Sequence, residues 1–413
     1  MNHSVASPQE AAVAVHELAR RLYEPDRVAG EIPPGLELSL SSGYPGLALL
    51  FAELAHTEEE YREVAHAYLS AAARHASGGD QVGLHSGLPA LAFATLSAVE
   101  ALGEYAEVFG RLDPRIVGRA QDLVRAERDR LDEGVPGTCP DVYGVPTGLA
   151  GLGCYLLARG ADHLSTLEDV LSCLVELTEP VQVDGRWVPG WYVQEESTGF
   201  LTGLGYGVCG PLALLALAWL SEVRVPYQDE AIERIAGWLL AWCQRDEAGP
   251  WWPAAVGLAE QLAGPGETSR PCLASWEFGT PGVARALQLA ARALGEPDWE
   301  LLAVEAARAV FTRPTDRWGA GDMWRTRAPG LRSGWAGLLQ VTWRIARDSG
   351  DSELAERLPW LAGRLLEEYD ADATFGFPQA GFLDGAAGVA LALRTYATDT
   401  EPASGWDSAL LLA

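Results

Sequence analysis

The stretch SGYPGLALLFA, residues 42–52, sets the pattern that decides the fold: a Gly-x-x-Gly turn opens a run of apolar residues. A Gly-x-x-Gly or Gly-x-x-Ala turn of this kind returns six more times along the 413 residues. The first glycines of the seven turns are Gly43, Gly87, Gly148, Gly207, Gly279, Gly334 and Gly385. Their spacing of about 45 to 70 residues is typical of supersecondary repeats and slightly longer units. The sequence therefore predicts a repeat protein.

The apolar runs and the segments between them predict two kinds of helix. Each run is apolar on nearly all sides, which indicates a helix buried all round. Amphipathic helices are expected at 11–23, after a capping box at Ser7, and at 229–244 and 352–369. Seven alternations of the two kinds predict an all-α fold, an α/α toroid with seven inner and about seven outer helices. Since each inner helix starts at a glycine turn, the turns are expected to meet at one end and to line the site.

The remaining signals concern strands and domain organisation. VQVDGRWVPGWYV, residues 181–193, places Asp184-Gly185 between two β-favouring runs and predicts one local hairpin. No linker or low-complexity segment divides the chain. Residues 1–413 are therefore expected to form a single domain with a small hairpin insertion.

Composition excludes several classes of function. The net charge of −27 argues against a nucleic-acid partner, because phosphate backbones favour clustered Lys and Arg. No run of eighteen uncharged apolar residues and no signal-peptide pattern is found, so we expect a soluble cytoplasmic protein without membrane insertion. The six cysteines lack CxxC spacing and are expected to be reduced. All seven histidines lie at or before His163.

Four turns carry a resemblance to a known family. DVYGVPTGLAG (141–151), GLGYGVCGPLALLALA (203–218), WEFGTPG (276–282) and LRSGWAGLL (331–339) match, in order and spacing, the motifs of the LanC-like lanthipeptide cyclases. The chain resembles this family over essentially its whole length. The resemblance implies addition of a peptide cysteine thiol to dehydroalanine or dehydrobutyrine, which closes a thioether ring.

The resemblance also implies a metal site that this sequence has lost. Most members of the family bind zinc through a cysteine in a Trp-Cys-Tyr-Gly motif and a Cys-His pair before Gly-Trp-Ala-Gly. Here the first motif has Glu277 in place of cysteine, and the pair reads Arg332-Ser333. A further family histidine aligns with Tyr206, whereas the aspartate of the Asp-x-x-x-Gly turn is retained as Asp141. A catalytic zinc needs about three protein ligands, so we expect neither metal nor cofactor.

Four residues are candidates for catalysis. Positions that share one metal in relatives must be neighbours, so Glu277 and Arg332 are expected to lie side by side. The pair either fastens two turns together or leaves Arg332 to stabilise the enolate of a Michael addition. Asp141 or Glu277 is a candidate base and Tyr206 a candidate proton donor to the α-carbon. Alternatively, Asp141 caps a helix and Tyr206 only packs its ring.

Further residues in or near the turns are expected to contact the peptide. They are His85, Trp276, Phe278, Trp324, Ser333, Trp335 and Asp384. For His85 a structural role is the alternative, because no partner motif accompanies it.

Three functions remain open from the sequence. The first is a zinc-independent cyclase that acts on a dehydrated precursor peptide and works with a separate kinase/lyase-type dehydratase. The second is a catalytically inactive toroid that binds the precursor or the modifying enzymes. The third is a carbohydrate-active enzyme, since α/α toroids also hold paired carboxylates for glycoside hydrolysis.

Overall fold

The computed structural model describes residues 5–76, 83–103, 105–194, 199–266, 273–313, 329–371 and 373–413. The chain divides into two compact units. Unit 1 holds residues 1–116 and 325–409, and unit 2 holds residues 117–324 and 410–413. The single-domain organisation expected from the sequence stays a prediction.

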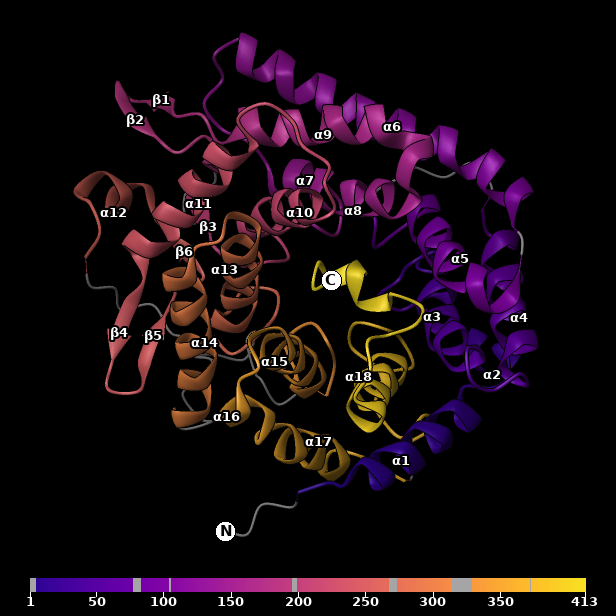
Figure 1. The fold of residues 1–413 in the computed structure, drawn as a ribbon. Coiled ribbons are helices and arrows are strands. Elements are labelled where there is room, and N and C mark those ends of the chain that lie inside the picture. The colour runs from indigo at the N-terminus through magenta and orange to yellow at the C-terminus, as the bar shows by residue number, and fades with distance from the viewer. Residues whose placement is uncertain are drawn as a thin grey trace. The chain divides into compact units, whose positions relative to one another are not determined.

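Unit 1 consists of two layers of helices. Its helices are α1 (Pro8–Arg21), α2 (Pro25–Ala29), α3 (Tyr44–Ala55), α4 (Tyr61–Arg74), α5 (Leu88–Leu102), α15 (Trp335–Ser349), α16 (Ser352–Ala355), α17 (Leu358–Glu367) and α18 (Ala386–Thr398), followed by the 3₁₀ helix η3 (Trp406–Leu410), whose last residue belongs to unit 2. The four helices that follow glycine turns pack in the order α15, α18, α3, α5. Amphipathic α1, α4 and α17 cover them on the outside (Figure 1).

Unit 2 repeats this arrangement with three glycine-opened helices. Its helices are most of α6 (Ala106–Asp132), α7 (Pro140–Tyr143), α8 (Leu149–Arg159), η1 (Gly160–His163), α9 (Leu164–Leu177), α10 (Cys209–Leu220), α11 (Gln228–Trp242), α12 (Leu258–Ala263), α13 (Thr280–Leu294) and α14 (Pro297–Thr312). Helices α8, α10 and α13 pack side by side in chain order. Helices α9, α11 and α14 lie against them as the second layer (Figure 1).

The glycine turns start the buried helices as the sequence predicts. A glycine is the N-cap residue of six of the seven, and all twelve residues of α3 are buried. Helix α10 begins two residues after Gly207, at Cys209. Ser7 closes a capping box with Glu10 and starts α1, as expected. The seven predicted buried helices are therefore present among the described residues.

One local expectation needs correction, and another is confirmed. The helix expected at 352–369 is divided into α16 and α17, because Pro359 lies in the first turn of α17 and cannot continue a preceding helix. The predicted hairpin forms from β1 (Val181–Val183) and β2 (Arg186–Val188), with Asp184 and Gly185 both at positive φ. Two further antiparallel pairs, missed from the sequence, join β3 (Phe200–Leu201) to β6 (Ala255–Val256) and β4 (Gln244–Asp246) to β5 (Gly249–Trp251).

None of the helices in the described part of the chain combines the length and the apolar character that crossing a bilayer requires.

Candidate active site

Backbone hydrogen bonds connect neighbouring turns within unit 1. The amide of Leu331 donates to the carbonyl of Leu383 (2.7 Å), and the amide of Leu383 donates to the carbonyl of Ser41 (3.2 Å). The amide of Leu40 in turn donates to the carbonyl of His85 (2.9 Å). Four successive turns are thus tied together at the N-terminal ends of α15, α18, α3 and α5.

The side chain of Arg332 connects these turns by hydrogen bonds. Its Nε donates to Oδ2 of Asp384 (3.2 Å), and its Nη2 donates to Oγ of Ser41 (3.4 Å). About a third of each side chain in the Arg332–Asp384 pair is exposed to solvent. The structure therefore brings together two predicted site residues, Arg332 and Asp384, and adds Ser41, which the sequence reasoning missed.

His85 has a structural contact in unit 1. Its buried Nε2 lies 2.7 Å from the carbonyl oxygen of Ala409. Burial lowers the pKa of His85 to about 4, so the ring is neutral at pH 7 and Nε2 donates to that carbonyl. A buried ring in this bond is not available to a peptide, which favours the structural alternative.

The turns of unit 2 are connected in the same way. The amide of Val145 donates to the carbonyl of Gly205 (2.9 Å), and the amide of Gly205 donates to the carbonyl of Glu277 (3.1 Å). A Cβ on Gly205 would lie 2.8 Å from Cγ of Glu277, and one on Gly203 would lie 2.1 Å from its carbonyl oxygen. Both glycines are therefore needed for Glu277, which is 4% exposed, to pack against the turn before α10.

Three other candidates of unit 2 lie in the same group of turns. The rings of Tyr206 and Phe278 are stacked, with centroids 5.8 Å apart and planes at 15°. The exposed carboxylate of Asp141, in the first turn of α7, accepts a 2.8 Å hydrogen bond from Oγ1 of Thr147. The structure thus gathers Asp141, Tyr206, Glu277 and Phe278 on adjacent turns and adds Thr147.

The position of a residue relative to the first glycine decides its burial in both units. The residue before that glycine is partly exposed in all seven turns: Ser42, Ser86, Thr147, Tyr206, Phe278, Ser333 and Asp384. The residue after the glycine and the residue three before it are buried in every turn. Thr147 occupies the same position as Tyr206, and this shared position is the signal that would have found it.

The same rule corrects the expectation for two tryptophans. Trp276 stands three residues before Gly279, and Trp335 directly follows Gly334, so both occupy buried positions of the repeat. The indole of Trp276 donates to the carbonyl of Leu410 (2.9 Å), and Trp335 packs edge-on against Trp360. Both rings therefore lie in the core and not on a surface that a peptide reaches. Trp324 lies outside the described residues.

The residues at the family's zinc positions do not fit a zinc ion. Glu277 supplies one carboxylate, but the guanidinium of Arg332 has no lone pair to donate and is hydrogen-bonded to Asp384. Ser333 supplies only a hydroxyl. Burial raises the pKa of the nearby Cys209 thiol, which disfavours the thiolate that zinc requires. The donor set of the described turns is thus of the wrong chemistry, and the Glu277–Arg332 pair, whose members belong to different units, stays a prediction.

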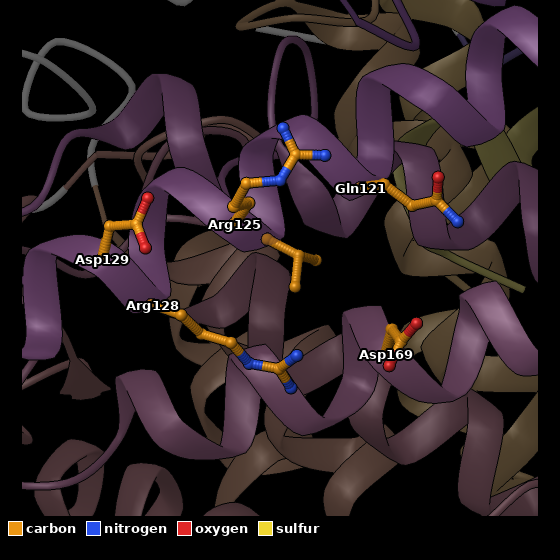
Figure 2. Close-up of a pocket in the computed structure, with 6 residues that line it drawn as sticks. Gln121, Arg125, Arg128, Asp129 and Asp169 are labelled. Atoms are coloured by element: carbon orange, nitrogen blue, oxygen red, sulfur yellow. The ribbon is translucent and has the colours of Figure 1, made fainter.

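A surface pocket of about 400 Å³ lies elsewhere in unit 2, between α6 and α9 (Figure 2). Its lining residues are Gln121, Val124, Arg125, Arg128, Asp129 and Asp169. Arg128 forms a two-point ion pair with Glu176 (3.0 Å for both bonds), and Arg125 pairs with Asp122. None of the candidate turn residues lines this pocket.

Comparison with known proteins defines the class to which the chain belongs. The family model described as "Lanthionine synthetase C-like protein" matches residues 34–411, and the chain therefore belongs to this family. Among solved structures the chain is similar to nisin cyclase, with 20% sequence identity, a TM-score of 0.76 and coverage of 98% of this chain and 97% of that one. This match confirms the predicted all-α, α/α toroid fold class. No curated protein sequence gives a match.

Proposed function

We propose that this protein is a zinc-independent cyclase, which adds cysteine thiols of a dehydrated precursor peptide to dehydroalanine or dehydrobutyrine. Membership of the lanthionine synthetase C-like family supports a cyclase-type reaction over the carbohydrate-active alternative. The observation that carries the proposal is the group of adjacent turns in unit 2. It presents an exposed carboxylate, Asp141, and a partly exposed phenol, Tyr206, where the residue types suit proton transfer.

The proposed reaction adds S–H across a carbon–carbon double bond. Asp141 takes the thiol proton, the sulfur electron pair forms the bond to the β-carbon, and the π electrons move into an enolate. Tyr206 then donates a proton to the α-carbon, and the proton held by Asp141 returns to the phenolate through solvent. Atoms and charge balance without an oxidant or a metal. A free thiol is already a few per cent thiolate at neutral pH, so positioning supplies much of the acceleration.

Burial assigns different roles to the two acids of unit 2. Asp141 is exposed and Glu277 is buried, so the substrate thiol reaches Asp141 more readily. Thr147 donates to Oδ1 of Asp141 and leaves Oδ2 to accept the proton. Glu277 packs against Gly205, the neighbour of Tyr206, and in this proposal it holds that turn in place.

Arg332 has the role of stabilising the enolate in this proposal. Its contacts to Asp384 and Ser41 fix the direction of the guanidinium, and fixed positive charge favours a developing oxyanion. Phe278, Ser333 and Asp384 are partly exposed and are proposed to contact the peptide. The partners proposed are the precursor peptide and a separate kinase/lyase-type dehydratase.

A second candidate function is an inactive scaffold that binds the precursor peptide or the modifying enzymes. The observation in its favour is the ion pair with Asp384, which already compensates the charge of Arg332. A compensated cation stabilises an enolate less than a free one does. The two candidates differ in whether the protein accelerates ring closure.

The test uses a peptide with one dehydroalanine and one cysteine. Free thiol is followed by alkylation and mass spectrometry, and the diastereomer ratio of the product is determined. We expect faster closure than in peptide alone and a single diastereomer, with kcat about 100-fold lower in Asp141→Asn and Tyr206→Phe. A rate and a diastereomer ratio equal to those of peptide alone would contradict the cyclase and leave the scaffold as the better candidate.

A further inference from the structure

The segment that ends the described chain, residues 403–413, is bound by buried polar side chains along its length. In unit 1 the carboxylate of Glu53 on α3 accepts hydrogen bonds from the amide (2.9 Å) and the hydroxyl (2.7 Å) of Ser404. His85 donates to the carbonyl of Ala409 (2.7 Å). Asp407, which is fully buried, accepts from Gln340 and Arg344 of α15. Buried hydrogen bonds therefore hold this part of the segment in the core of unit 1.

Unit 2 binds the end of the same segment through two buried donors. The indole Nε1 of Trp276 donates to the carbonyl of Leu410 (2.9 Å). Arg285 on α13 donates from Nε (3.0 Å) and Nη2 (2.6 Å) to the carbonyl of Leu412. Trp276 and Arg285 are each 1% exposed, and Leu410, Leu411 and Leu412 are completely buried.

Trp276 is next in sequence to a candidate site residue. It directly precedes Glu277, whose carbonyl accepts the amide of Gly205, and Gly205 directly precedes Tyr206. The next residue of the same turn, Phe278, stacks on the ring of Tyr206 and its amide is bonded to Ser275. A displacement of the indole therefore moves both backbone and ring contacts of Tyr206.

We infer that the carbonyl of Leu410, through Trp276, sets the position of Glu277 and Tyr206, so that Trp276 is a positioning residue and Leu410–Leu412 are part of the site. This inference rests on the proposed function in so far as Tyr206 acts on the substrate. The physical reason is that catalysis requires near-attack geometry, and a displacement of about 1 Å costs about 100-fold in rate. A buried indole held by one directional bond fixes its neighbours against such a displacement.

The test compares two variants that lose the same kind of bond. Trp276→Phe removes the donor to Leu410 and keeps an aromatic ring in the core. Trp252→Phe is the matched control, because Trp252 is also 1% exposed in unit 2 and its indole donates to a backbone carbonyl, that of Leu239 on α11 (2.7 Å). Both variants should lose similar stability, which separates a general loss of stability from a loss of positioning.

Two readouts are measured on both variants. The first is amide hydrogen exchange at Gly205 and Phe278, which we expect to be about tenfold faster in Trp276→Phe and unchanged in Trp252→Phe, as loss of one hydrogen bond predicts. The second is kinetics with the peptide that carries dehydroalanine and cysteine. We expect kcat to fall about tenfold or more in Trp276→Phe with KM unchanged, and to stay at the wild-type value in Trp252→Phe.

Deletion of residues 410–413 is the second perturbation, and it should reproduce the exchange pattern of Trp276→Phe. Equal exchange at Gly205 and Phe278 in Trp276→Phe and Trp252→Phe, or equal kcat in the two, would overturn the inference. If the wild-type protein does not accelerate ring closure, the proposed function fails, and the exchange comparison still decides whether Leu410 positions the turn.

Discussion

Unit 1 holds two Arg–Asp pairs that differ in burial and in hydrogen-bond geometry, one inside α15 and one in the turn before it. Arg344, inside α15, forms two bonds of 2.7 and 2.9 Å with Asp407, and the two side chains are 6% and 0% exposed. Arg332, in the turn before α15, forms one bond of 3.2 Å with Asp384, and the two side chains are 32% and 35% exposed. The residue types are the same, so the difference lies in burial and geometry.

The comparison separates a structural pair from a pair that a substrate can reach. Burial disfavours the charge of Arg344, but the neighbouring Asp407 carboxylate outweighs this effect and raises the pKa of Arg344. Removal of Asp407 would leave the buried guanidinium of Arg344 with only the exposed Glu401 carboxylate, 3.8 Å away, as an ion-pair partner, at a cost of about 3 kcal/mol. A partly exposed pair contributes about 0–1 kcal/mol, so the Arg332–Asp384 pair is explained poorly by stability alone. The role of Arg332 therefore has to be decided by the rate of ring closure and not by stability.

The largest effect is expected from Asp407→Ala. We expect the free energy of unfolding to fall by about 3 kcal/mol, because Arg344 loses its buried partner and keeps only the longer contact with Glu401. Chemical denaturation followed by circular dichroism measures the change. Asp384→Ala is the control and should cost less than about 1 kcal/mol. Equal losses in the two variants would remove the distinction between the pairs.

The next effect is a loss of stability in acid that depends on His85, which binds residues 403–413 as Arg344 does. Its pKa of about 4 in the folded protein lies below the value of 6.5 expected when unfolded. Between these values only the unfolded state binds the proton, so stability is lost as the pH falls from about 6.5 to 4. The full loss is roughly 3 kcal/mol.

The measurement is the free energy of unfolding from pH 7 to pH 4 for wild type and His85→Gln, which keeps an N–H donor for Ala409. We expect the wild-type protein to lose roughly 3 kcal/mol more than the variant over this range. Parallel pH profiles for the two proteins would show that His85 is not the group responsible.

A smaller change in stability and a larger change in rate are expected from Arg332→Ala. Because the guanidinium is partly exposed, unfolding should change by less than about 1 kcal/mol. Loss of enolate stabilisation should lower kcat about 100-fold. Denaturation and ring-closure kinetics are measured on the same preparation, with Arg332→Lys as the variant that keeps the charge. A wild-type rate together with lowered stability would assign Arg332 to structure.

The smallest effect on stability is expected from Thr147→Val, which removes the donor to Asp141 and keeps the shape of the side chain. One partly exposed hydrogen bond should change unfolding by less than about 1 kcal/mol. We expect kcat to fall by about tenfold, because the carboxylate loses its fixed direction. Unchanged kcat would mean that Thr147 does not orient Asp141.

The arrangement of the helices could be predicted from the sequence because the signals of the repeat are local. The glycine turns, the apolar runs and the Ser7 capping box each act over a few residues, and α1, α3 and β1–β2 follow as expected. The short strands β3 and β6 were missed, since they pair residues more than fifty positions apart and carry no turn between them. Long-range pairing of this kind leaves no local pattern.

The candidate site was predicted less completely. The turns gave Asp141, Tyr206, Glu277 and Arg332 as candidates, and their roles stay predictions. Partners such as Asp384 for Arg332 depend on which turns become neighbours in the fold. The burial of Trp276 was open to prediction, because the position three before each first glycine is apolar in every repeat. The hydrogen bond from Trp276 to Leu410 could not be predicted, because the two residues are 134 positions apart.

The central claim is that these turns promote ring closure without zinc, and the most direct test is the rate of closure at three metal levels. The protein is assayed after dialysis against a chelator, as purified, and with added zinc, always with the peptide that carries dehydroalanine and cysteine. We expect the same rate above that of peptide alone in all three. Loss of the rate after chelation and its recovery with zinc would contradict the account.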